Sequence, residues 1–168
     1  TDRRDAAELS ELLWVNRERL REGKRVNGLR RVTLPGPEDR QLRKLTTRRS
    51  KTKRRRGKVV TQMKTVVRNH NLQHECPTKK LDTKKGFAWL RELELPAEDR
   101  LEVDQLLDEW ELLSQQLEAQ DALLEEHGRR EEKGVSILTT IPGCALFSAL
   151  VLLSRIGELS RFANPRSL

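Results

Sequence analysis

The chain has 168 residues, of which 36% are charged and 35% are hydrophobic, so its hydrophobic core must be thin. Aromatic residues make up only 4% and Tyr is absent, which argues against a large globular enzyme fold and favours an extended, all-α protein. The formal net charge of +8 indicates an anionic partner such as nucleic acid or an anionic membrane surface.

The cysteines indicate the redox compartment, and the hydropathy pattern indicates whether the chain could span a membrane. Cys76 and Cys144 lie far apart in unlike surroundings, so we expect no disulfide framework and a reducing compartment. The longest uncharged apolar run, residues 137–154, is interrupted by a Pro-Gly pair, so we expect no membrane span. The chain starts at Thr1 within a helical pattern, and we expect it to be a piece of a longer protein.

The first predicted element is a helix that Thr1 or Asp2 can cap. Its apolar residues are spaced to bury one face; they are Ala6, Leu9, Leu13 and Leu20. Asp2 and Asp5 share one side of this helix and lie close enough together to hold Mg²⁺. Alternatively, the two acids have a structural role only: one caps the helix, and the other is stabilised by the positive end of the helix dipole. Two acids on one helix are too few for two-metal chemistry.

A Gly- and Pro-punctuated connector over residues 23–37 separates this first domain, residues 1–34, from a helical middle region, residues 35–130. Residues 40–74 hold 13 Lys and Arg and no Asp or Glu. Apolar residues at heptad-compatible positions flank the densest charge run, which predicts one long helix with a polar middle and a possible weak point at Gly57.

This basic helix is predicted to contact nucleic acid, because so many cations without anions repel one another unless something negative lies against them. The alternative is a solvated face. The lack of interleaved aromatic residues favours contact with the phosphate backbone over base stacking. The predicted contact residues are Arg48, Arg49, Lys51, Lys53, Arg54, Arg55, Arg56 and Lys58.

Residues 73–86 are polar, Lys-rich and interrupted by Pro77, which predicts a loop, and residues 87–90 are expected to form a short apolar turn that Pro96 closes. His70, His74 and Cys76 invite a zinc site. We reject this site because a fourth ligand and a repeated ligand pair are both missing.

Residues 97–126 carry the most regular pattern of the chain, the seam of a coiled coil. The seam residues alternate three and four apart and are Val103, Leu106, Trp110, Leu113, Leu117, the polar Gln120, and Leu124. The flanks are strongly acidic, so this helix is expected to pair antiparallel with the basic helix. The seam could equally pair between two chains and form a homo-oligomer.

A charged linker over residues 129–133, bracketed by Gly128 and Gly134, is predicted to precede a third region, residues 131–168. Pro142 and Gly143 break an apolar run into two helices joined by a hairpin. Backbone amides at the positive end of the second helix, including that of Gly143, would suit a phosphate oxygen, as in a helix-hairpin-helix element. The plainer interpretation is a turn between two core helices.

This hairpin region resembles the start of the C-terminal domain of the insertion sequence one-hundred-ten family, the DEDD-type transposases that use a bridge RNA. The matching positions are Leu138, Ile141, Pro142, Gly143, Ala149, Ile156, Gly157, Arg161 and Phe162. The chain departs at Ala145, where the family prefers Gly, and at Leu146, where it often has Pro. At the other end, Thr1, Asp2, Asp5 and Ala6 match the Thr-Asp-x-x-Asp-Ala motif on the last helix of the family's RuvC-like nuclease domain.

The resemblance implies that Asp2 and Asp5 are two of the four acids of a Mg²⁺ site, and that an intact relative cleaves and exchanges DNA strands with these acids and a serine. It further implies DNA and a bridge-type RNA as partners and a location in the cytoplasm, on DNA. The serines near the end of the chain match no catalytic serine; they are Ser148, Ser154, Ser160 and Ser167. No catalytic set is therefore complete, and we expect this chain to bind nucleic acid without cutting it. The alternatives are a non-enzymatic basic adaptor for DNA or RNA and a structural coiled-coil protein.

Overall fold

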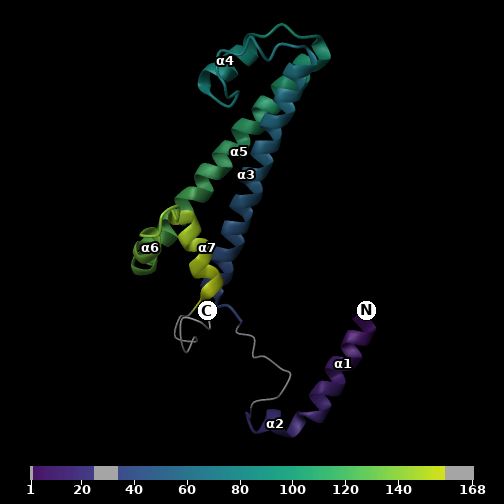
Figure 1. Cartoon of the computed structure of the whole chain (residues 1–168), viewed down its shortest axis with the longest axis vertical. Helices are drawn as coiled ribbons and strands as arrows, with labels where there is room; N and C mark the ends of the chain where they lie inside the picture. Colours follow the sequence, from purple (N-terminus) through teal and green to yellow (C-terminus); the bar gives the residue numbers. More distant parts are fainter. Residues whose placement is uncertain (1, 25–33, 158–168) are drawn as a thin grey trace. The chain divides into compact units, whose positions relative to one another are not determined.

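The computed structural model describes residues 2–24 and 34–157, and all regular secondary structure in these ranges is helical (Figure 1), which confirms the all-α class. The chain divides into two compact units, Thr1–Leu34 and Pro35–Leu168. Thr1, Arg161 and Phe162, which carry part of the family resemblance, lie outside the described residues.

The first unit contains α1, Asp2–Val15, and the short α2, Arg17–Arg21. The expected burial of one face of α1 is not found: within the described residues, neither helix buries a side chain. Leu9 and Leu13 are 60% and 45% exposed. A unit this small cannot surround an apolar stripe with enough chain to exclude water.

The second unit is organised around two long helices that lie side by side, α3, Pro37–Asn69, and α5, Ala97–Arg130 (Figure 1). The two helices run antiparallel. His70 at the end of α3 pairs with Asp99 at the start of α5, whereas Arg49, earlier in α3, pairs with Asp121, later in α5. This is the predicted antiparallel pairing. α3 passes through Gly57 without a break.

The predicted coiled-coil seam of α5 packs against α3 of the same chain. Six of its seven residues are buried and Trp110 is half-buried. Two hydrophobic clusters result, one around Val59, Met63 and Val103 and the other around Leu42, Leu124 and Leu150. The arm formed by α3 and α5 therefore has an apolar core at each end.

Between the two clusters the interface contains a buried polar pair beside Leu117. Gln120 Nε2 donates to Thr52 Oγ1 at 3.3 Å, and both residues are buried. Gln120 Oε1 has no hydrogen-bond partner among the described residues. A buried polar pair of this kind fixes the register of two helices at a cost in stability.

At one end of the arm, the chain between α3 and α5 contains α4, Lys84–Glu92 (Figure 1). The expected apolar turn at residues 87–90 is part of this helix instead. The Thr83 hydroxyl caps α4 by accepting from the Gly86 amide at 3.0 Å, and Phe87 and Leu90 are buried against the arm. The Thr83 cap starts the helix, and the spacing of the buried apolar residues stabilises it against the arm. Together they explain why these residues form a helix rather than the expected turn.

At the other end lie α6, Glu132–Thr139, and α7, Leu146–Ile156 (Figure 1). The expected linker at residues 129–133 is helical except at Glu131. Its bracketing glycines serve packing: a Cβ on Gly128 would lie 2.7 Å from Leu146, and one on Gly134 would lie 3.0 Å from Leu153. These glycines allow α7 to approach both α5 and α6 closely.

Candidate nucleic-acid interface

The basic segment of α3 exposes a row of cations that the packing with α5 leaves in water. Lys44, Lys51 and Lys58 are exposed and lie seven residues apart, so they share one side of the helix. Arg40 and Arg54 are exposed on the same side, and exposed Arg48 flanks it. We call the six residues Arg40, Lys44, Arg48, Lys51, Arg54 and Lys58 the outer basic face; it spans about 27 Å of helix.

None of these six side chains forms an ion pair with any residue that the structure describes. The two ion pairs that the structure describes between α3 and α5 use Arg49 and Arg55, which lie outside this set. Like charges spaced along one helix repel one another and attract mobile counterions. The outer basic face is thus a surface on which a polyanion would relieve repulsion.

Three arginines of the predicted contact set are directed to α5 instead. Arg49 forms a two-pronged ion pair with Asp121, at 2.6 and 3.2 Å, and its guanidinium lies 4.5 Å from the centre of the Phe147 ring. This arginine joins α3 to both α5 and α7. Its contacts are internal to the protein, so we leave it out of the proposed interface.

Arg55 and Arg56 are similarly engaged. Arg55 pairs with Glu109 at 2.7 Å, while Arg56 donates to the Ser114 hydroxyl at 3.3 Å and lies over the Trp110 ring. Lys53 is exposed but lies off the outer basic face. Which cations face outward depends on the phase of α3 relative to α5, and a run of consecutive basic residues does not reveal this phase.

Two residues of the outer basic face are not among the eight predicted contact residues. Arg40 and Lys44 precede the dense charge run, yet they lie on the same side of α3 as Lys51 and Lys58. The seven-residue spacing from Lys44 to Lys51 is the sequence signal that could have found them.

The hairpin between α6 and α7 is exposed at its apex. The Cys144 amide donates to the Ile141 carbonyl at 3.0 Å, with Pro142 second and Gly143 third at φ +83°, which are the features of a type II turn. Pro142 and Gly143 are both exposed, and Ala145, the N-cap of α7, supplies no side-chain hydrogen bond. The predicted contact at Gly143 therefore lies on a surface that solvent reaches.

Asp2 and Asp5 both lie in the first turn of α1 and are exposed. Two carboxylates one turn apart can supply part of a Mg²⁺ donor set, since this ion binds through one or two protein carboxylates and several waters. Within residues 2–24 and 34–157, no group of three His, Cys, Asp or Glu side chains is placed to hold a metal ion. The structure therefore places Asp2 and Asp5 on one turn, with no third ligand beside them among the described residues.

Comparison of the chain with protein-family models, curated proteins and solved structures finds no match. Among the described helices, none is both long enough and apolar enough to cross a bilayer.

Proposed function

We propose that this chain binds nucleic acid through the outer basic face, as the helical arm of a DEDD-type transposase of the insertion sequence one-hundred-ten family. The observation that carries the proposal is the row of six exposed cations, unpaired among the described residues, in a segment without acids. Each phosphate that a cation neutralises releases condensed counterions, and this release supplies sequence-independent affinity. The function is then DNA binding within DNA transposition and recombination.

The role of the two ends of the chain follows from the same proposal. In an intact relative, Asp2 and Asp5 would be two of the acids that hold Mg²⁺, and the metal would polarise the scissile phosphate. In this chain the outer basic face holds and orients the nucleic acid, and the exposed hairpin at Gly143 adds a backbone contact. A bridge-type RNA could occupy the same face, because phosphate contacts do not distinguish sequences.

The chain alone is proposed to be inactive as a nuclease, because two acids on one turn cannot position two metal ions. Incubation of the purified protein with supercoiled DNA and Mg²⁺ should leave the DNA intact. Nicking that disappears when Asp2 and Asp5 are both changed to Ala would contradict this. For an intact relative we propose activity in the cytoplasm, on DNA.

The binding proposal is tested by charge reversal with a matched control. Changing Lys51, Arg54 and Lys58 to Glu should weaken binding to a short DNA duplex strongly, as measured by fluorescence anisotropy. The control changes the exposed residues Lys80, Lys84 and Lys85 to Glu, which alters the net charge by the same amount at the other end of the arm. Equal losses for both variants would show that net charge, rather than the outer basic face, drives binding.

A purely structural role is the second candidate, and one observation favours it. Leu101, Leu112 and Leu123 are 59%, 54% and 50% exposed and lie eleven residues apart, so they share the side of α5 that faces away from α3. A homo-oligomer would have to use such a surface, since the predicted seam is buried against α3. Sedimentation of a dimer that nucleic acid does not affect would favour this role.

A further inference from the structure

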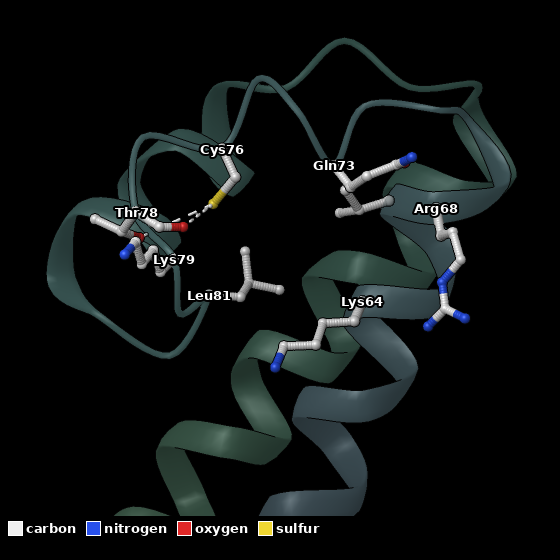
Figure 2. Close-up of a pocket in the computed structure, with 8 residues that line it drawn as sticks. Lys64, Arg68, Gln73, Cys76, Thr78, Lys79 and Leu81 are labelled. Carbon is white, nitrogen blue, oxygen red and sulfur yellow. Dashed lines mark hydrogen bonds between the residues drawn. The ribbon is translucent and has the colours of Figure 1, made fainter.

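The pocket of about 300 Å³ beside the end of α3 does not gather its polar groups on one ligand (Figure 2). The Arg68 guanidinium and the Gln73 amide point away from Lys79. The Thr78 hydroxyl donates to the Lys80 carbonyl at 2.7 Å and is therefore already engaged. The unpartnered surface with the most regular pattern lies on α5 instead.

Three leucines form a row along the side of α5 that α3 does not cover. Leu101, Leu112 and Leu123 are 59%, 54% and 50% exposed, and we call these three residues the leucine line. They lie eleven residues apart, so the row drifts by only about 20° around the helix from each leucine to the next. The ion pair that joins α4 to α5, Arg91 with Glu111, lies about 100° around α5 from Leu112 and leaves the line open.

The stretch between the leucines carries little charge. Within about 50° of the line, α5 exposes Gln105, Gln116 and Ala119, together with one acid, Asp108. A mostly uncharged strip with a regular apolar row on one side of a helix is typical of a surface that packs against another helix. The pattern therefore indicates a helical partner that runs along α5.

The two ends of the leucine line carry opposite charges. Glu98 lies on this side in the first turn of α5, and Arg130 lies on it in the last turn. Two copies of α5 packed in parallel would bring like ends together. Packed antiparallel, they would bring Glu98 of one copy within about one turn of Arg130 of the other. Arg130 also pairs with Glu126 of its own helix, but its side chain is 66% exposed and has further donors.

The leucine line is also symmetric about its middle residue, because the two intervals are equal. A two-fold axis beside Leu112 would place Leu112 against its own copy and Leu101 against Leu123 of the second copy. The same axis would place Gln105 against Ala119 of the second copy. Each apolar residue thus meets an apolar residue, which is the self-complementarity that a two-fold interface requires.

We infer that a second copy of this chain docks along the leucine line, with the two α5 helices antiparallel and Leu112 at the two-fold axis. The inference goes beyond the proposed function, because the contact uses no residue of the outer basic face, which lies on α3. A strip that is one helix wide is at the small end of specific interfaces, so we expect a dimer Kd on the order of 10 µM.

The first test is sedimentation equilibrium of the full chain without nucleic acid, from about 1 to about 200 µM, a range that brackets this Kd. The wild-type chain should pass from monomer to dimer. Leu112→Glu places like charges at the two-fold axis and should raise the dimer Kd by at least about tenfold. The matched control is Leu9→Glu, which changes a leucine that is 60% exposed on α1 and should leave the Kd unchanged. Circular dichroism should show equal helix content for both variants.

The second test is cross-linking with a short bismaleimide, which reports the orientation. Cys76 and Cys144 are first changed to Ser, so that each new cysteine is the reporter. Leu112→Cys should cross-link. Gln105→Cys alone should not, because antiparallel helices would hold the two copies of this position about 21 Å apart along the axis. Gln105→Cys combined with Ala119→Cys should cross-link again.

Three results would overturn the inference. They are a monomer over the whole concentration range, an equal loss of dimer for Leu9→Glu, and cross-linking of Gln105→Cys alone, which indicates parallel helices. In the first case the leucine line contacts a different partner, and in the second the copies associate through α1.

Failure of this inference and failure of the proposed function can be told apart. Leu112→Glu should bind a DNA duplex as Leu9→Glu does, since the two variants have the same net charge and an intact outer basic face. The variant with Lys51, Arg54 and Lys58 changed to Glu should still form the dimer. A wild-type chain that binds duplex as a monomer at 200 µM, about twenty times the expected Kd, overturns only the inference. A dimer that does not bind duplex overturns only the proposed function.

Discussion

Changing Arg49 to Ala should lower the stability of the second unit well beyond the effect of a neighbouring arginine. The Arg49 side chain is only 19% exposed, forms two hydrogen bonds to Asp121, and lies over the Phe147 ring. A charge-assisted hydrogen-bonded pair contributes about 1.5 to 3 kcal/mol. A partly exposed cation on an aromatic ring adds about 0.5 to 1 kcal/mol.

Solvent reduces the first of these contributions, because the Asp121 side chain is 44% exposed. We therefore expect the free energy of unfolding to fall by about 2 kcal/mol, which lowers Tm by about 7 °C in a unit of this size. The measurement is thermal unfolding followed by circular dichroism. Arg48 is the matched control, since it is exposed on the adjacent position, forms no ion pair with a described residue, and its change to Ala costs no helix propensity.

The outcome separates structural arginines from interface arginines. A fall in Tm for Arg49→Ala no larger than that for Arg48→Ala would refute the assignment of Arg49 to the interior. It would also reopen the whole basic run as one binding surface.

Two further changes test the packing of the arm. Gly86→Ala should destabilise the protein by about 1 to 3 kcal/mol, because the new Cβ would lie 2.3 Å from the Leu81 carbonyl oxygen. Gly57→Ala, which has open space around it in α3, should stabilise the protein by up to about 1 kcal/mol. Similar Tm values for the two variants would contradict this. Gln120→Leu should raise Tm, because it removes a buried carbonyl oxygen without a partner, while the Thr52 hydroxyl keeps its bond to a backbone carbonyl on α3. A lower Tm in thermal unfolding would show that the Gln120–Thr52 pair stabilises the arm more than an apolar contact does.

Local patterning predicted the parts of the fold that depend on periodicity and net charge. The heptad spacing of Val103, Leu113 and Leu117 placed a seam on α5, and the opposite charges of the two long segments indicated that they pair antiparallel. Both features repeat over several turns, so errors at single positions do not change the conclusion.

Features that depend on one contact between distant residues could not be predicted. Arg49 and Asp121 are 72 residues apart, and nothing in either local sequence selects this partner. Gly128 and Gly134 suggested a break because glycine disfavours helix, yet close approach of α7 requires small residues at both positions. The run of consecutive cations on α3 does not show which of them face α5; their direction follows from the phase that the buried residues Leu42, Val59 and Met63 set.

The central claim is that the outer basic face binds nucleic acid through phosphate contacts. It is tested most directly by the slope of log Kd against log salt concentration for a DNA duplex. If all six cations contact phosphates, the slope should approach about 5, and changing Lys51, Arg54 and Lys58 to Gln should reduce it by about 2.7. A slope that these changes leave unaltered, or absence of duplex binding at low salt, would contradict the claim.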